Sequence, residues 1–193
     1  MLSAQDGRTA ANSFVTPREQ EEYISLRATI SRRGTARVYI FALGAAAWAA
    51  LTLATLALAL PPVATLIPLV ALAATFEAVL ALHVGVERIG RYLLVVHGDQ
   101  WERYAGTFGR PAGAIAVDAL FTTPFLVAAV LTMIPLLATR PIVQELVVVA
   151  GSVLAFIVRV LVGRAGTSRQ RGVDEKRFRE MRERGNEPNQ INS

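Results

Sequence analysis

Four ionisable side chains lie toward the inner ends of stretches of the sequence that are largely apolar, and their positions limit the chemistry open to them. They are Glu77, His83, Asp118 and Arg159. An ionised side chain inside the hydrocarbon of a membrane costs roughly 2.5–3.5 kcal/mol, so it needs an oppositely charged partner or a route to water. Glu77 or Asp118 can pair with Arg159, and His83 can lie beside that pair; alternatively, Arg159 alone can extend to the headgroups. We therefore predict that these four residues form an intramembrane polar cluster.

A metal site would need more ligands than this sequence offers. His83 and Glu87 are four residues apart and share a helix face, which would supply half of a site. The other histidine, His97, follows on the same predicted helix on the order of 20 Å away. The chain has no cysteine, no HExxH pattern, no phosphate-binding glycine loop and no plausible nucleophile and base pair. The sequence predicts no metal, no cofactor and no enzymatic activity.

The composition predicts the environment that surrounds these residues. Of the 193 residues, 53% are hydrophobic, against roughly 45–50% in soluble domains. The mean hydropathy is +0.41, and the polar residues are concentrated at the two ends and in one central stretch. The absence of cysteine excludes a disulfide-built scaffold, and the high hydrophobicity argues against a disordered chain. We expect one small integral membrane domain.

Four apolar stretches approach the roughly 20 residues that a helix needs to cross a bilayer. Pro61-Pro62 separates the first two, because proline suits the first turn of a helix and disrupts an interior. A short turn around Thr139-Arg140-Pro141 separates the last two. The sequence therefore predicts an all-α, polytopic fold with four transmembrane helices in two hairpins. The predicted spans are 38–60, 63–85, 113–138 and 141–162.

The arginines predict the orientation of these spans. They gather before the first span, between the second and third, and after the fourth, whereas the opposite side has only Arg140. This distribution predicts a multi-pass protein of a bacterial-type inner membrane, with both termini cytoplasmic and close to anionic headgroups. Residues 1–36 lack the apolar core of a signal peptide, so the first span is expected to be an uncleaved anchor. We expect no nucleic-acid partner, because arginines that flank apolar spans are an orientation signal.

The chain divides into three predicted parts. Residues 1–36 form a cytoplasmic segment whose amphipathic helix begins at the capping pattern Thr16-Pro17-Arg18-Glu19 and turns into the bilayer near Gly34. Residues 37–163 form the transmembrane domain, including a cytoplasmic connection over 86–112. Residues 164–193 form a basic tail; a flexible linker over 163–172 leads from the transmembrane domain into it and precedes a charged helix.

Several residues outside the spans are candidates for contact with a partner. The second helix is expected to protrude to Gly98, with polar residues on one side, and a further capped amphipathic helix follows in the connection, before the second hairpin. The charged tail helix offers few apolar anchors. The candidates are Glu87, Arg88, Arg91, Trp101, Tyr104 and Phe108 on the cytoplasmic surface, and Arg177, Phe178 and Met181 in the tail.

Local sequence also predicts how the spans meet one another. Ala46, Ala50 and Ala54 in the first span, and Gly151 and Ala155 in the fourth, have the small-residue spacing that lets helix backbones approach closely. Such contacts can form within one subunit or between copies. Pro124 and Pro135 are expected to bend the third helix.

Two functions are compatible with these patterns. The first is a non-enzymatic accessory, assembly or regulatory subunit that binds a protein partner or forms a homo-oligomer. The alternative is a small oligomeric transporter or channel that uses Glu77, Asp118 and Arg159. A path across the membrane needs polar groups at successive depths, yet the outer half of the first three spans offers only threonine hydroxyls. The lack of other polar groups in the outer half favours the interaction subunit. The threonines there include Thr52, Thr55, Thr65 and Thr132.

Overall fold

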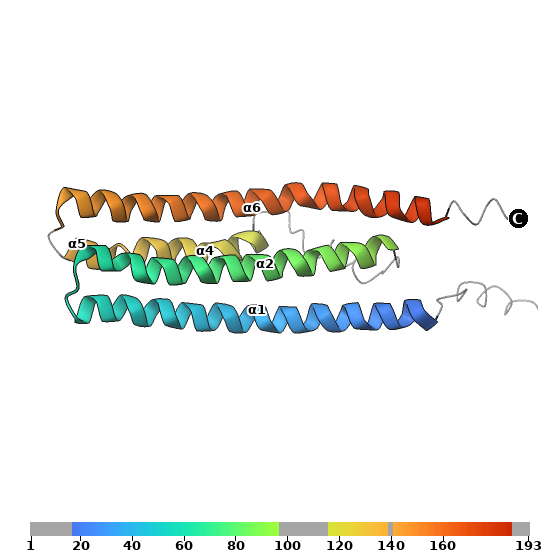
Figure 1. Cartoon of the computed structure of the whole chain (residues 1–193), viewed down its shortest axis with the longest axis horizontal. Helices are drawn as coiled ribbons and strands as arrows, with labels where there is room; N and C mark the ends of the chain where they lie inside the picture. The colour runs from blue at the N-terminus through green and yellow to red at the C-terminus, as the bar shows by residue number, and fades with distance from the viewer. Residues whose placement is uncertain (1–16, 97–115, 139–140, 187–193) are drawn as a thin grey trace, which may run out of the picture.

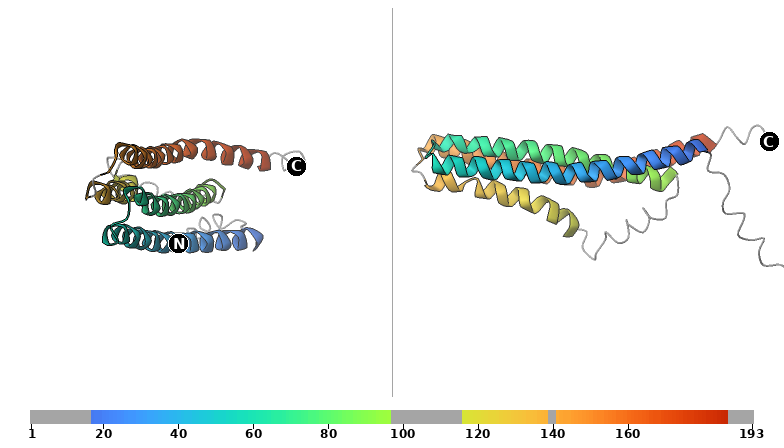
Figure 2. Two further views of the ribbon diagram at one scale, coloured as in Figure 1. Left: turned by 60° about the vertical axis from the view of Figure 1, so that its left-hand side comes forward. Right: turned by 90° about the horizontal axis from the view of Figure 1, so that it is seen from below.

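The chain folds into long helices that lie side by side. In the computed structural model, the residues described are 17–96, 116–138 and 141–186. They form α1 (Pro17–Ala57), the short 3₁₀ helix η2 (Pro62–Thr65), α2 (Leu66–Val96), α4 (Ala116–Leu131), α5 (Ile134–Ala138) and α6 (Val143–Asn186). No strand occurs in these ranges, so the predicted all-α fold is confirmed. α2 lies between α1 and α6, and α4 covers one face of this row (Figures 1 and 2).

Three helices are long and apolar enough to cross a membrane. They span Gln20–Ala57, Pro62–Val95 and Val143–Gly166, and the most apolar 18-residue stretches within them have mean hydropathies of 1.9, 2.1 and 2.5. Only 11% of the most apolar stretch of the first is buried within the molecule, so most of its side chains face outward, where lipid can solvate them. The third predicted span, 113–138, yields only a shorter apolar helix over Thr122–Ala138. The transmembrane character is supported, but the predicted layout of four spans in two hairpins is not confirmed.

Two predicted breaks do not occur. α1 is a single helix of 41 residues that passes through Gly34, where we expected a turn into the bilayer. α6 is a single helix of 44 residues that passes through 163–172, where we expected a flexible linker. A glycine inside a helix costs about 1 kcal/mol, and packing against a neighbouring helix can outweigh that cost. Gly163 packs in this way, since a Cβ there would lie 3.1 Å from Leu80.

Pro62 and Pro135 interrupt helices where the sequence predicts, whereas Pro124 lies inside the continuous helix α4. After α1 the chain turns through Ala59, which adopts a positive φ of 48°, and η2 begins at Pro62. In the third segment, α4 ends at Leu131 and α5 begins at Ile134, directly before Pro135. Proline has no N–H to donate to the preceding turn, so the helix is interrupted there.

A polar contact ties α1 to this interruption. The Trp48 indole N–H donates to the Thr132 hydroxyl at 2.9 Å, and that hydroxyl donates to the Ala128 carbonyl at 2.8 Å. Thr132 is completely buried. A hydroxyl that both accepts and donates is satisfied, so Thr132 has a structural role at this depth.

Aromatic rings fill the centre of the bundle. Phe76 of α2 meets Phe125 of α4 and Phe156 of α6 edge to face, with ring centroids 5.2 and 6.0 Å apart. Phe41 of α1 meets Phe125 in the same way at 5.7 Å. These pairs bring all four long helices together around an apolar core, to which Leu69, Leu72, Ala128, Ala129, Val153 and Val160 also belong.

α1 and α2 pack tightly at Gly44. A Cβ at Gly44 would overlap the side chain of Thr75, so only glycine permits this approach. The small residues that we singled out from the sequence lie elsewhere. Ala46, Ala50 and Ala54 are exposed, and a Cβ at Gly151 would meet nothing within 4 Å. Those stripes therefore do not pack against other helices of this chain.

Candidate functional site

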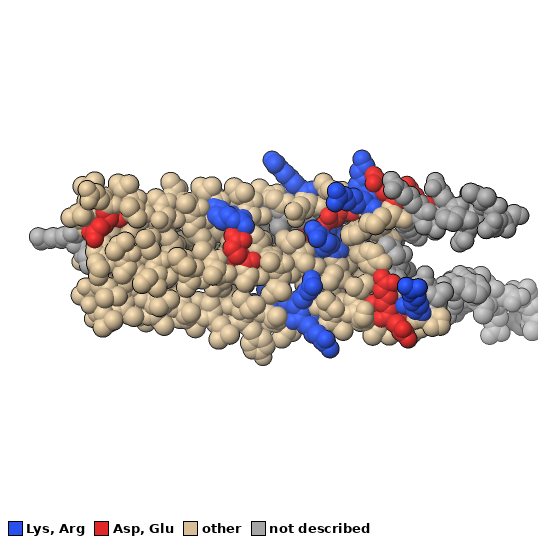
Figure 3. Space-filling view, viewed as in Figure 1, with Lys and Arg blue, Asp and Glu red and all other residues tan. Residues whose placement is uncertain are grey.

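Charged side chains gather toward one end of the bundle (Figure 3). We call this the charged end and define it as residues 17–37 of α1, 83–96 of α2 and 163–186 of α6. The opposite end, where the chain passes from α1 to η2 and into α6, is the turn end. The carboxylate of Glu145 lies there and accepts a hydrogen bond from the backbone N–H of Ile142 at 3.2 Å. Glu145 thus caps the start of α6.

Glu77 and Arg159 form an ion pair between α2 and α6. Arg159 Nη2 lies 2.7 Å from Glu77 Oε2, and the Arg159 guanidinium lies 6.0 Å from the centre of the Phe76 ring. Their side chains are 49% and 46% exposed, respectively, so the pair lies on the outer face of the bundle and not in its core. The structure shows the pairing of Glu77 with Arg159 that the sequence suggested. The side chain of Asp118, on α4, lies outside the described residues.

His83 belongs to a different group of polar residues. Its Nδ1 accepts a hydrogen bond from Arg37 Nη1 of α1 at 3.0 Å, and its Nε2 lies 3.5 Å from Glu87 Oε1. An accepting Nδ1 requires the tautomer that carries its proton on Nε2, which faces the carboxylate. His83 is six residues, about 9 Å along the helix axis, from Glu77. Instead of joining the Glu77–Arg159 pair, it links α1 to the charged end of α2.

The contacts continue from Glu87 into α6. Arg91 Nη1 lies 3.5 Å from Glu87 Oε2, and Arg91 Nη2 donates to Asp174 Oδ2 at 3.1 Å. Arg88 Nε lies 3.6 Å from the same Asp174 oxygen. We call these six residues, from Arg37 on α1 to Asp174 on α6, the charged-end network; they are Arg37, His83, Glu87, Arg88, Arg91 and Asp174.

The network corrects the expected cytoplasmic surface. The side chains of Arg91 and Asp174 are only 10% and 13% exposed, and that of Glu87 is 21% exposed. Arg88, at 57%, remains at the surface. Glu87 and Arg91 are enclosed because α6 stays helical beyond the apolar zone and places Asp174 against α2.

A second set of contacts joins α1 and α6 to α2. The Tyr92 hydroxyl donates to Glu22 Oε1 at 2.8 Å, and its ring meets Phe178 edge to face at 5.6 Å. Phe178, which the sequence suggested as a tail contact, therefore packs within the molecule. Arg177 and Met181 are exposed. Trp101, Tyr104 and Phe108 lie outside the described residues.

Sequence reasoning missed Arg37, Asp174, Glu22 and Tyr92. The spacing of Glu87 and Arg91 signals an ion pair on one helix. No comparable signal links Asp174 to Arg91, because they are 83 residues apart. Within the described ranges, no three His, Cys, Asp or Glu side chains are grouped so that they could hold a metal. No protein-family model matches the chain, and no curated protein or solved structure matches it either.

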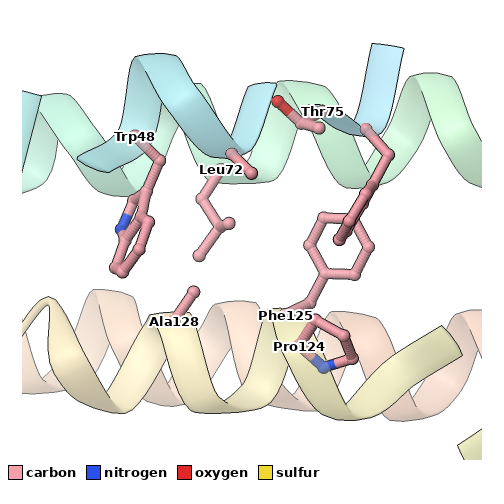
Figure 4. A pocket seen from close by; sticks show the side chains of 8 residues that line it. Trp48, Leu72, Thr75, Pro124, Phe125 and Ala128 are labelled. Carbon is pink, nitrogen blue, oxygen red and sulfur yellow. The ribbon is translucent and has the colours of Figure 1, made fainter. Parts of the chain in front are cut away.

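An apolar pocket lies on the face of the bundle that α4 covers. It has a volume of about 160 Å³ and lies between α1, α2 and α4 (Figure 4). The Phe41–Phe125 contact borders it toward the charged end. Its lining residues are Phe41, Ala45, Trp48, Leu72, Thr75, Pro124, Phe125 and Ala128.

The Glu77–Arg159 pair leads to a first prediction. Arg159→Gln leaves the Glu77 carboxylate without this partner in an apolar zone, so we expect it to destabilise the protein in a bilayer by about 1–3 kcal/mol. Glu77→Gln should cost a similar amount, and the double substitution should cost less than the sum. Thermal unfolding in lipid nanodiscs measures the stability of the three variants against that of the wild type. Strictly additive losses would show that the two side chains do not stabilise each other.

Proposed function

We propose that this protein is a non-enzymatic accessory, assembly or regulatory subunit of a bacterial-type inner membrane, and that its charged end is a cytoplasmic contact surface. One observation carries the proposal. α1, α2 and α6 continue beyond the apolar zone as a bundle joined by the Arg91–Asp174 ion pair and the Tyr92–Glu22 hydrogen bond. These contacts point inward and hold three helices together, so they support a stable platform whose outer side chains can bind a partner.

The outer side chains of this platform are predominantly basic. Exposed acids are fewer than exposed cations in the described part of the charged end, which favours a partner with an acidic surface. Arginines near span ends also favour the cytoplasmic side of the membrane. The exposed cations are Arg18, Arg32, Arg33, Arg88, Arg169, Lys176, Arg177 and Arg179, and the exposed acids are Glu21, Glu22, Glu180 and Glu183.

Site-specific crosslinking in native membranes tests this proposal. A photoreactive residue replaces Met181 at the charged end or, as the matched control, Leu43 in the apolar zone; both side chains are exposed. We expect a protein adduct of one defined mass from position 181 only. Arg177→Glu combined with Arg179→Glu should reduce that adduct, because they reverse the charge beside the probe. A charged end that yields no protein adduct would contradict the proposal.

Point substitutions are preferable to truncation in this experiment. Removing residues 164–193 would also remove Asp174 and Phe178, which pack against α2. If the truncated protein no longer bound a partner, the cause could be the disrupted packing of the bundle instead of the missing contact surface. Arg177 and Arg179 are exposed, so their substitution changes the surface while those packing contacts remain.

The transport alternative has a separate test. In the described residues, Phe76, Phe125 and Phe156 meet in the centre of the bundle, the pocket beside them is apolar, and Glu77 and Arg159 lie on the outer face. A polar path that uses the pair would therefore run between copies of the chain. If the protein is an interaction subunit, Glu77→Gln should leave ion flux into proteoliposomes unchanged. A flux that the wild type supports and that folded Glu77→Gln protein lacks would favour the transporter.

A further inference from the structure

The apolar pocket between α1 and α4 has the properties of a hydrocarbon site. Its lining is almost entirely carbon, and Figure 4 shows Trp48 and Phe125 toward its two ends with Leu72 between them. A cavity of about 150 Å³ lined by apolar side chains stays dry and accepts an apolar molecule as large as benzene. The pocket, at about 160 Å³, therefore suits a segment of a hydrocarbon chain better than water or an ion.

A cation lies on the same face of α1 as this pocket. Arg37, Phe41, Ala45 and Trp48 follow one another at steps of four, four and three residues, so they share one helix face. The hydrogen bond from Arg37 to His83 holds the guanidinium at the junction of α1 and α2. Along the axis, Arg37 is about 12 Å from Ala45. One leaflet accounts for half of a core roughly 30 Å thick, so an acyl chain whose phosphate lies at Arg37 can reach the pocket.

We propose that Arg37 and the pocket bind one anionic phospholipid from the leaflet at the charged end. The phosphate lies at the Arg37 guanidinium, and one acyl chain enters the pocket beside Ala45 and Trp48. The charge around Arg37 on α1 favours an anionic headgroup over a zwitterionic one. Arg32 and Arg33 precede it, and α1 has no acidic residue after Glu22. The cationic group of a choline headgroup would meet these arginines unfavourably.

Trp48 serves as the reporter, because it lines the pocket. The chain has two tryptophans, so Trp101→Phe makes Trp48 the only indole. The protein is reconstituted in phosphatidylcholine vesicles that contain a small fraction of lipid with brominated acyl chains, either phosphatidylglycerol or, as the matched probe, phosphatidylcholine. Bromine quenches a tryptophan only at close range. We expect the phosphatidylglycerol probe to quench Trp48 at about one fifth of the concentration that the phosphatidylcholine probe requires.

Two pairs of variants separate the headgroup contact from the pocket. Arg37→Gln should remove the roughly fivefold preference for phosphatidylglycerol, whereas Arg32→Gln, with the same charge change on another face of α1, should retain most of it. Ala45→Leu narrows the pocket and should reduce quenching by both probes. Ala46→Leu adds the same side chain on the exposed face and should leave quenching unchanged.

Three results would overturn the proposal. Equal quenching by the two probes in the wild-type protein would mean that the pocket does not select an anionic lipid. If Arg32→Gln and Arg37→Gln reduced the preference for phosphatidylglycerol equally, only the general surface charge would matter. Quenching that Ala45→Leu does not reduce would place the acyl chain elsewhere. This last variant keeps the Arg37–His83 contact, so it tests the site even if Arg37→Gln does not fold.

Discussion

Gly44→Leu should force α1 away from α2 and destabilise the protein by about 3 kcal/mol or more, because even a methyl group at this position overlaps Thr75. For a chain of this length, each kcal/mol lowers the melting temperature by roughly 2–4 °C, so we expect a decrease of about 6–12 °C. Thermal unfolding in detergent or nanodiscs, followed by circular dichroism, measures it. Leucine favours helices more than glycine does, so helix propensity opposes this loss.

Gly151 offers a matched control for this substitution. It lies inside α6, and a Cβ there would meet nothing within 4 Å. Gly151→Leu should therefore leave the melting temperature unchanged or raise it slightly, since it removes the helix cost of glycine, about 1 kcal/mol. Equal losses from both substitutions would mean that the close approach of α1 and α2 at Gly44 does not limit stability.

Asp174→Ala should loosen the charged end while the apolar part of the bundle stays folded. The substitution removes the closest carboxylate from Arg91, whose side chain is only 10% exposed. Breaking a buried ion pair from one side costs about 3–5 kcal/mol. Glu87 still contacts Arg91, so we expect the lower part of that range or less. Hydrogen exchange should become faster in the charged-end segments of α2 and α6 and remain slow around Phe76 and Phe156.

Lys176→Ala provides the comparison for Asp174→Ala. Lys176 is exposed, lies two residues along the same helix, and has the opposite charge. Lys176→Ala should leave hydrogen exchange at the charged end nearly unchanged, since substitutions of exposed residues usually change stability by no more than about 0.5 kcal/mol. If Lys176→Ala loosens the charged end as much as Asp174→Ala does, the Arg91–Asp174 pair is not what holds α6 to α2.

The features that sequence reasoning predicted well are those in which one physical cost dominates. An ionised side chain in an apolar zone needs an opposite charge or a route to the headgroups, and the structure shows the first of these for Glu77 and Arg159. Proline has no N–H, so interruptions are expected at prolines and occur at Pro62 and Pro135, although Pro124 lies inside α4. The all-helical fold and the three long apolar spans follow from long runs with few charges.

The features that sequence reasoning missed depend on small differences between competing free-energy contributions, such as helix propensity and packing. Glycines at 163, 166 and 172 suggested a linker, but each costs only about 1 kcal/mol in a helix, and packing decides the outcome. Once α6 is continuous, its helical phase places Asp174 beside Arg91 and Phe178 beside Tyr92. A single sequence does not reveal that phase, so the charged-end network and the buried side of the tail were not predicted.

The continuity of α1 and α6 has a mechanical consequence. At 1.5 Å per residue they are about 62 and 66 Å long, roughly twice the thickness of a hydrocarbon core. Neither has a hinge where it leaves the apolar zone. Long helices accommodate a thinner or thicker bilayer by changing their tilt. Because α1 and α6 are continuous, such a change of tilt at the lipid boundary would displace their ends at the charged end by a larger distance.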